Sequence, residues 1–466
     1  MVMKKIFFNI NKLVLGVVLV AGSVSSCKKL IVIPKNPPSL ITQQEQFADS
    51  ATTMSAVAGV YTYAPSYGFA YSDGSLTYCA GLSADELSPI ISNDVQQFYS
   101  YNLTPLNSEI TNLWGYPYQS VYEVNAVLTG ITNNSALSAS FQKQVTGEME
   151  VVRALYYFNM VNLFSGIPLV TTTTYAATDR LPRSPATAIY AQVKADLADA
   201  RKKLTAAYPS SGHIRPNLYT AVALLAKVNL YQGNWQSAYN EADSVIRLGG
   251  YSLAPNLNNV FLDGSVEAIW QLPANGLYSV YTDAANFQPQ YAGANPNFLV
   301  TPFLLNAFET GDQRLQDWIG STSVVKNQTL YYPNKYKNIS PTATPVEDQM
   351  ILRLGELYLI RAEAAAQLNN LTQALADINT IRQRAGLSPN PADAASQTTV
   401  LNAVMRERRV ELFCEWGNRW FDLKRTGTAA TVLGSEKTGY TANAALYPLP
   451  QTQIQLDNLL IQNPGY

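Results

Sequence analysis

Two segments of this chain share one pattern, which constrains the fold more than any other feature of the sequence. Residues Ala226–Ala238 (AKVNLYQGNWQSA) match residues Ala362–Ala374 (AEAAAQLNNLTQA), with alanine at both ends of each segment. Gly233 aligns with Asn369, and these two residue types best tolerate the left-handed backbone conformation that ends a helix. A large apolar residue follows two positions later in each segment. The pattern predicts helix, tight turn, helix, with small residues that let the two helices approach closely.

Apolar residues at helical spacing predict more helices elsewhere in the chain. The clearest are Gln43–Val60, Ser108–Leu128, Phe141–Phe164, Ala186–Leu204 and Gln397–Trp416. We expect about four helix pairs, which resemble the tetratricopeptide unit and must stack because none buries its apolar face alone. The predicted fold class is all-α: tetratricopeptide-like pairs forming a right-handed superhelical scaffold, with a loop-rich irregular subdomain inserted between them.

Two long stretches, at about 61–107 and 252–350, lack strong periodicity and are rich in Tyr, Gly, Pro and Asn. Loops of this length are usually functional or disordered. Their aromatic content argues against disorder. We therefore expect one domain over 41–466, with these two stretches as its functional insertions.

The N-terminus has the features of an export signal. Two early lysines precede the apolar run Leu13–Val20, which is too short to span a bilayer. The following Val-Ser-Ser-Cys resembles a bacterial lipobox, in which the cysteine is lipidated and becomes the first mature residue. An ordinary cleaved signal with a chance cysteine is the alternative. We predict a lipoprotein signal peptide at 1–26, lipidation at Cys27 and a tether over 27–40.

Charge and cysteine content exclude several classes of function. Lys and Arg number 32 against 33 Asp and Glu, so nothing favours nucleic acid. Cys79 and Cys414 allow a disulfide but do not imply one, and their spacing is not that of metal ligands. The sequence has no nucleophile elbow, zinc-protease helix or phosphate loop. We predict no catalytic residue, no metal site and no cofactor.

Four segments, which follow Cys27 in the expected order, resemble the SusD/RagB family of outer-membrane, starch-binding-like nutrient-binding lipoproteins. They are Glu148–Val170, Arg353–Glu363, Glu407–Gly427 and Tyr447–Tyr466. One small departure is the turn Ser165–Leu169, whose glycine stands one place later than the family pattern. The resemblance therefore extends over the whole chain.

The resemblance implies a lipid-anchored protein on the outer face of the outer membrane. Such proteins bind oligosaccharides, or sometimes peptides, and pass them to a SusC-like TonB-dependent transporter over which they form a lid. They are not enzymes. Three alternatives stay open: a peptide-binding member of the family, a helix-repeat scaffold that contacts only protein, and a carbohydrate-active enzyme.

Glu407, Glu411 and Glu415 recur every four residues, which raises the question of glycosidase chemistry. Pairing with nearby arginines is the simpler interpretation, and it opposes the raised pKa that a catalytic acid needs. The neighbouring arginines are Arg406, Arg408, Arg409 and Arg419. We predict a structural role for this segment, and similarly for Arg353, Glu356, Arg361, Glu363 and the pair Asp312 and Arg314.

Ligand contacts are expected on the two long loops. The flat face of a sugar stacks on an aromatic ring, while amides and carboxylates satisfy its hydroxyl groups. In the family, ligand contacts come from loops placed like these two, although no shared motif transfers a single residue. The predicted ligand-binding residues are Tyr67, Tyr71, Asp73, Phe98, Tyr99, Tyr101, Asn102, Tyr278 and Tyr281.

Overall fold

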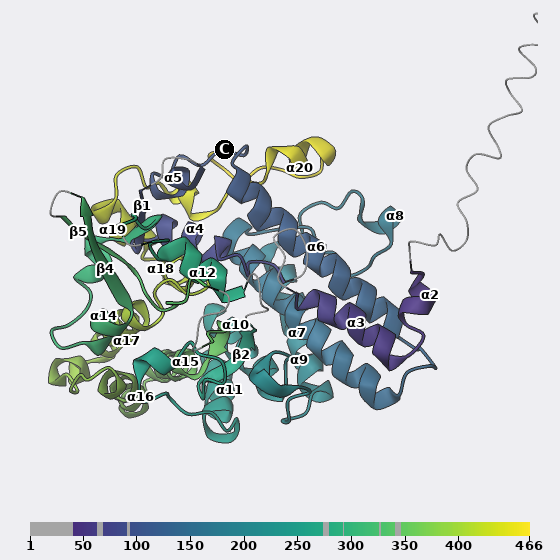
Figure 1. The fold of residues 1–466 in the computed structure, drawn as a ribbon, viewed down its shortest axis with the longest axis horizontal. Coiled ribbons are helices and arrows are strands. Elements are labelled where there is room, and N and C mark those ends of the chain that lie inside the picture. Colours follow the sequence, from purple (N-terminus) through teal and green to yellow (C-terminus); the bar gives the residue numbers. More distant parts are fainter. Residues whose placement is uncertain are drawn as a thin grey trace, which may run out of the picture.

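The computed structural model describes residues 41–62, 69–90, 94–273, 279–291, 293–325, 328–340 and 346–466. The predicted signal peptide, Cys27 and the tether lie outside this set. Most elements are helices, with long helices at one end of the molecule and short strands toward the other (Figure 1).

The first predicted helix is divided into two, α2 (Gln43–Gln46) and α3 (Ser50–Val60). The division follows from Asp49, whose carboxylate accepts a hydrogen bond from the backbone N–H of Thr52 at 2.8 Å. The Thr52 side chain bonds back to Asp49, which completes a capping box. A new helix therefore starts at residue 50, and the predicted single helix over 43–60 was wrong at this point.

Three long helices form where the sequence predicts them, within a few residues. They are α6 (Ser108–Ile131), α7 (Ala139–Phe164) and α9 (Ala186–Lys203). The second half of α7 is buried on nearly every side, and both α6 and α9 pack against it. This burial explains why the sequence of the second half of α7 is nearly continuously apolar rather than amphipathic.

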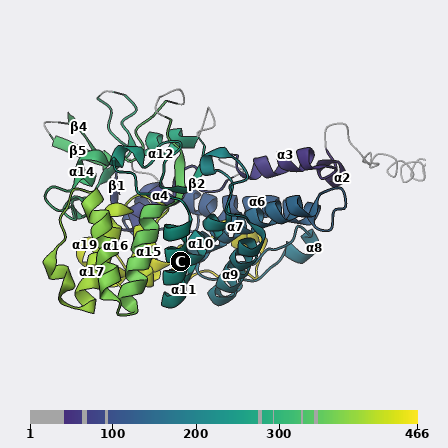
Figure 2. The same cartoon turned by 90° about the horizontal axis from the view of Figure 1, so that it is seen from below.

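The two repeated segments form helix pairs that stack on each other. The bounds are α10 (Leu218–Tyr231), α11 (Trp235–Leu248), α15 (Leu354–Gln367) and α16 (Leu371–Arg384). Gly233 and Asn369 adopt the expected left-handed conformation, with φ of 69° and 62°. Helix α11 packs against α15, and α17 (Gln397–Glu411) covers α15 and α16 (Figure 2). The predicted tetratricopeptide-like scaffold is confirmed.

Close packing between the paired helices makes a first prediction. Ala374 on α16 is fully buried among small residues of α15. Ala374→Leu should lower the free energy of unfolding by about 1–3 kcal/mol, because the added atoms force the two helices apart. Ala376→Leu, at an exposed position of the same helix, should change it by less than about 0.5 kcal/mol. Urea denaturation measures both, and equal losses would contradict this account.

The two predicted loop regions contain short stretches of regular structure within a fold that is mostly helical, as predicted. Three antiparallel strand pairs form: β1 (Leu87–Pro89) with β3 (Phe298–Val300), β2 (Ala268–Leu272) with β6 (Gln349–Arg353), and β4 (Ile319–Val325) with β5 (Gln328–Pro333). Strands β2 and β6 are buried at every residue, so they lack the alternation that marks a strand in a sequence. Pairing of β1 with β3 joins the first predicted insertion to the second.

Short helices complete the described part of the chain. They are α4 (Ser75–Ser83), α5 (Asp94–Tyr99), α8 (Tyr175–Thr178), α12 (Ser279–Phe287), α13 (Pro302–Leu305), α14 (Gln313–Asp317), α18 (Asn418–Arg425), α19 (Ala429–Glu436) and α20 (Gln451–Leu456). One large hydrophobic cluster extends from Phe47 to Leu460 and includes residues of both insertions. Across the described ranges, no helix combines the length and the apolar character needed to cross a bilayer.

Candidate functional site

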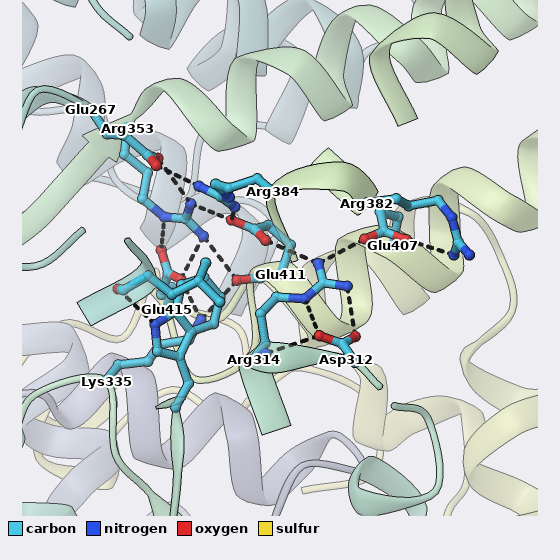
Figure 3. A network of polar contacts seen from close by, with 12 residues as sticks. Glu267, Asp312, Arg314, Lys335, Arg353, Arg382, Arg384, Glu407, Glu411 and Glu415 are labelled. Atoms are coloured by element: carbon cyan, nitrogen blue, oxygen red, sulfur yellow. Dashed lines mark hydrogen bonds and ion pairs between the residues drawn. The ribbon is translucent and has the colours of Figure 1, made fainter. Parts of the chain in front are cut away.

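The three glutamates that raised the question of catalysis lie in a buried network of ion pairs (Figure 3). Glu411 is at its centre: Arg353 Nη1 lies 2.6 Å from Oε1, and Arg314 Nη1 lies 3.0 Å from Oε2. Arg384 also contacts Glu411. Burial opposes ionisation, but the guanidinium groups of Arg384, Arg353 and Arg314 hold the pKa of Glu411 well below its usual range. An acid held ionised in this way cannot donate a proton near neutral pH.

The outer members of this network confirm a structural role for the segment. Glu407 lies 2.7 Å from Arg314, and Glu415 lies 2.8 Å from Nε of Arg353 and 2.5 Å from Nζ of Lys335. Asp312 also pairs with Arg314, at 2.8 Å, as the sequence predicted. The network joins α14, α16, α17 and β6, which lie far apart in the chain.

The predicted partners of these glutamates were wrong. Arg406 pairs with Asp393, Arg408 with Asp422, and both Arg409 and Arg419 with Asp85. Adjacent positions on a helix point to different sides, so the arginines next to Glu407 and Glu411 face other elements. Helix α17 ends at Glu411, and Glu415 therefore lies in the following turn rather than on the same helical face.

Two of the predicted ligand-binding rings lie inside the core. Phe98 is fully buried and packs edge-on against Tyr447, with ring centroids 5.2 Å apart. Tyr71 is 2% exposed, and its hydroxyl donates to the carbonyl of Leu113 at 3.0 Å. Neither ring offers a face to a ligand, because this part of the first insertion folds against the helical core. Both therefore leave the set of candidate ligand contacts.

Tyr99 and Tyr101 are half-buried and flank a buried lysine. The Lys437 ammonium lies 4.6 Å from the ring centroid of Tyr99 and 4.4 Å from that of Tyr101. Burial lowers the pKa of Lys437 to about 7. The Tyr101 hydroxyl donates to the carbonyl of Ser83 at 2.8 Å. These rings hold Lys437 on one side, and the adjacent Asn102 is exposed beside them.

Asp73 is half-buried at the start of α4. Its carboxylate accepts hydrogen bonds from Ser75 N–H at 3.0 Å and from the Ser75 hydroxyl at 2.6 Å, while burial raises its pKa. Asn286 of α12 donates to the Asp73 carbonyl at 3.0 Å, which brings the two insertions together here. Tyr67 and Tyr278 lie outside the described residues, and Tyr281 lies in α12 with its side chain outside the described part.

A cavity that the sequence did not predict lies where α6, α8 and α20 meet. Its volume is about 570 Å³, and Trp114 and Tyr118 of α6 line its floor. The Tyr175 ring stands at its edge and is 78% exposed. Three exposed polar side chains lie around it: Gln119, Asp179 and Arg180. The segment 175–180 is the sequence feature that could have indicated this cavity, because it brings a ring, a carboxylate and a guanidinium close together.

This cavity combines what a sugar requires: an accessible ring, an apolar floor and polar groups at the rim. Concave sites of a few hundred cubic ångströms with few, well-placed polar groups are typical of small-ligand binding. Within the described ranges, no group of three or more His, Cys, Asp or Glu side chains is arranged to hold a metal ion. The arrangement can bind and orient a ligand.

The helix-pair scaffold and its two insertions define a class of protein built on tetratricopeptide-like repeats. Residues 320–466 match the model of the SusD family, and residues 42–230 match a model described as starch-binding associating with outer membrane. The chain belongs to the SusD family.

Relatives and solved structures agree with this assignment. SusD-like protein P25 of Formosa agariphila is 24% identical over 513 residues, covering 95% of this chain and 97% of the relative. A solved laminarin-binding SusD-like protein is 24% identical with a TM-score of 0.77, covering 90% of this chain and 100% of that one. A SusD superfamily protein of Bacteroides vulgatus has the same TM-score and coverage at 21% identity. These structures confirm the fold.

Proposed function

We propose that this chain is a cell-surface lipoprotein that captures oligosaccharides and delivers them to a SusC-like TonB-dependent transporter of the outer membrane. Family membership supports carbohydrate binding, and the family description supports association with the outer membrane. The predicted lipid on Cys27 provides the anchor. The buried, ion-paired glutamates support binding without hydrolysis.

The observation that carries this proposal is the cavity between α6, α8 and α20. Tyr175 offers an open ring face, unlike Phe98 and Tyr71, which pack inward. Asp179 and Arg180 provide an acceptor and several donors for hydroxyl groups next to that ring. We place the main sugar contacts here, and keep Asp73, Tyr99, Tyr101 and Asn102 as a second candidate contact surface.

Calorimetry against a panel of glycans tests the ligand class. Laminarin oligosaccharides are the first probe, because a structural neighbour binds laminarin; starch oligosaccharides and peptides follow. Tyr175→Ala should weaken glycan binding by about tenfold, which is the effect of losing roughly 1.4 kcal/mol of ring contact. Tyr331→Ala, an exposed ring on β5, is the matched control and should leave the affinity unchanged.

Other results of these binding experiments would show which part of the proposal is incorrect. If Tyr99→Ala with Asn102→Ala weakens binding while Tyr175→Ala does not, the ligand lies on the first insertion. Binding of peptides without glycans would favour the peptide-binding alternative. If neither ligand class binds, the capture function fails. Co-purification of a TonB-dependent barrel with the wild-type lipoprotein tests the delivery step separately.

A further inference from the structure

An apolar groove lies next to the point where the described chain begins. Its volume is about 460 Å³, and α2, α3 and α6 form its walls. Tyr122 of α6 lines it and is 58% exposed, and Ile41, the first described residue, lines it and is 62% exposed. Ala56, Gly59 and Ala126 lie along it as well, and their small side chains leave the groove open. The groove is thus largely apolar and accessible, although Gln43, Gln46 and Glu123 also line it.

The residues just before Ile41 contain an unusual sequence for a tether. Leu30-Ile31-Val32-Ile33 is a run of four large aliphatic residues, with Lys28 and Lys29 before it and Lys35 after it. Flexible linkers are normally polar or rich in glycine, serine or proline. Burying such side chains against an apolar surface is favourable relative to leaving them in water. This run therefore requires an apolar partner.

The length of chain between the run and the groove allows them to meet. Ile33 and Ile41 are separated by a short segment that contains Pro34, Pro37 and Pro38. At about 3.3 Å per residue, this segment reaches roughly 25 Å, which is enough for the run to fold back over the groove. Because Ile41 already lines the groove, the chain leaves the described body at the groove itself.

We propose that Leu30–Ile33 occupies the groove between α2, α3 and α6, so that most of the tether is held against the body. Only Cys27 to Lys29 would then bridge to the membrane. The edge formed by α2, α3 and α6 would lie next to the bilayer, and the orientation of the whole protein would be restricted. This inference goes beyond ligand capture and does not depend on what the protein binds.

A fluorescent probe on the full lipidated chain in nanodiscs tests the proposal. Cys79 and Cys414 are buried and Cys27 carries the lipid, so Ile31→Cys supplies the accessible thiol for an environment-sensitive dye. We expect blue-shifted emission and protection from iodide. Ala126→Glu places a charge in the groove and should shift the emission to that of the dye in water, with several-fold stronger iodide quenching. Ala376→Glu, on exposed α16 surface, is the control and should change neither quantity.

A second variant separates loss of docking from loss of folding. A side chain at Gly59 meets no atom within 4 Å of its first carbon, so Gly59→Gln should fold normally while filling the groove. It should release the dye as Ala126→Glu does, with an unchanged circular dichroism spectrum. If the wild-type dye is exposed to water, the proposal is overturned. If spin-labelled lipid quenches the dye and neither groove variant changes its emission, the run lies in the bilayer and the proposal is also overturned.

Discussion

Replacing Glu411 with alanine should lower the free energy of unfolding by about 3–5 kcal/mol, because removal of one partner leaves buried charges uncompensated. Glu411 is fully buried, and Arg314, Arg353 and Arg384 all direct guanidinium groups at its carboxylate. Without it, these three cations lose the one carboxylate that they share, in an environment that water does not reach, and keep only their outer partners. Chemical denaturation of residues 41–466, monitored by circular dichroism, measures the loss.

An exposed ion pair provides the matched control. Arg247 is mostly exposed and lies 3.4 Å from Asp243 on the same helix. Arg247→Ala should cost less than about 0.5 kcal/mol, as is usual for surface pairs. If Glu411→Ala were as mild as Arg247→Ala, the network would not stabilise the fold in the way described here.

Raising the pH from 5 to 8 should destabilise the protein, and the ionisation of Glu86 should be one of the main reasons. Burial, and then the charge of Asp85, raise the pKa of Glu86 to about 8. Between its unfolded pKa of about 4.5 and its folded pKa, Glu86 binds more protons in the folded state, so stability falls as the pH rises. A pKa shift of this size lowers the free energy of unfolding at pH 8 by about 3–5 kcal/mol, relative to a carboxyl group with an unchanged pKa.

Glu86→Gln tests this pH dependence directly. The neutral amide keeps an acceptor for the N–H of Cys414, so the variant should unfold at a higher temperature than the wild type at pH 8. At pH 5, where Glu86 is already protonated in the folded state, the two should be similar. Asp283 and Glu150, whose pKa values burial raises to about 7, contribute slopes of the same sign, so Glu86→Gln should remove only part of the pH dependence. Asp263→Asn, at an exposed acid, should retain the full wild-type slope, and a Glu86→Gln slope equal to it would contradict the assignment.

The periodic parts of the sequence predicted the scaffold well. Helices α7 and α9 begin and end close to their predicted positions, and the turns at Gly233 and Asn369 have the expected conformation. These features depend on residues near one another in the chain, so a local pattern is enough to reveal them. The capping box at Asp49 is also local, but it lay inside an apolar pattern that continued across it.

Long-range pairing could not be read from the sequence in the same way. Glu411 pairs with arginines at 314, 353 and 384, although Arg408 and Arg409 are much nearer in the chain. The rings of the first insertion matched the composition of a sugar platform, but composition does not reveal which side of a ring faces the core. Phe98 faces inward, whereas Tyr175, in a short segment outside both predicted insertions, faces outward.

The order of charges along the chain has a consequence for biosynthesis. Arg314, Arg353 and Arg384 are all translated before Glu407, Glu411 and Glu415, which neutralise them in the finished molecule. A nascent polypeptide that stops short of these glutamates would have to bury the three cations with Asp312 and Glu267 as their remaining ion-pair partners among the described residues, so burial would be less favourable. The buried ion-pair network can therefore be completed only after α17 and the turn that contains Glu415 have been made.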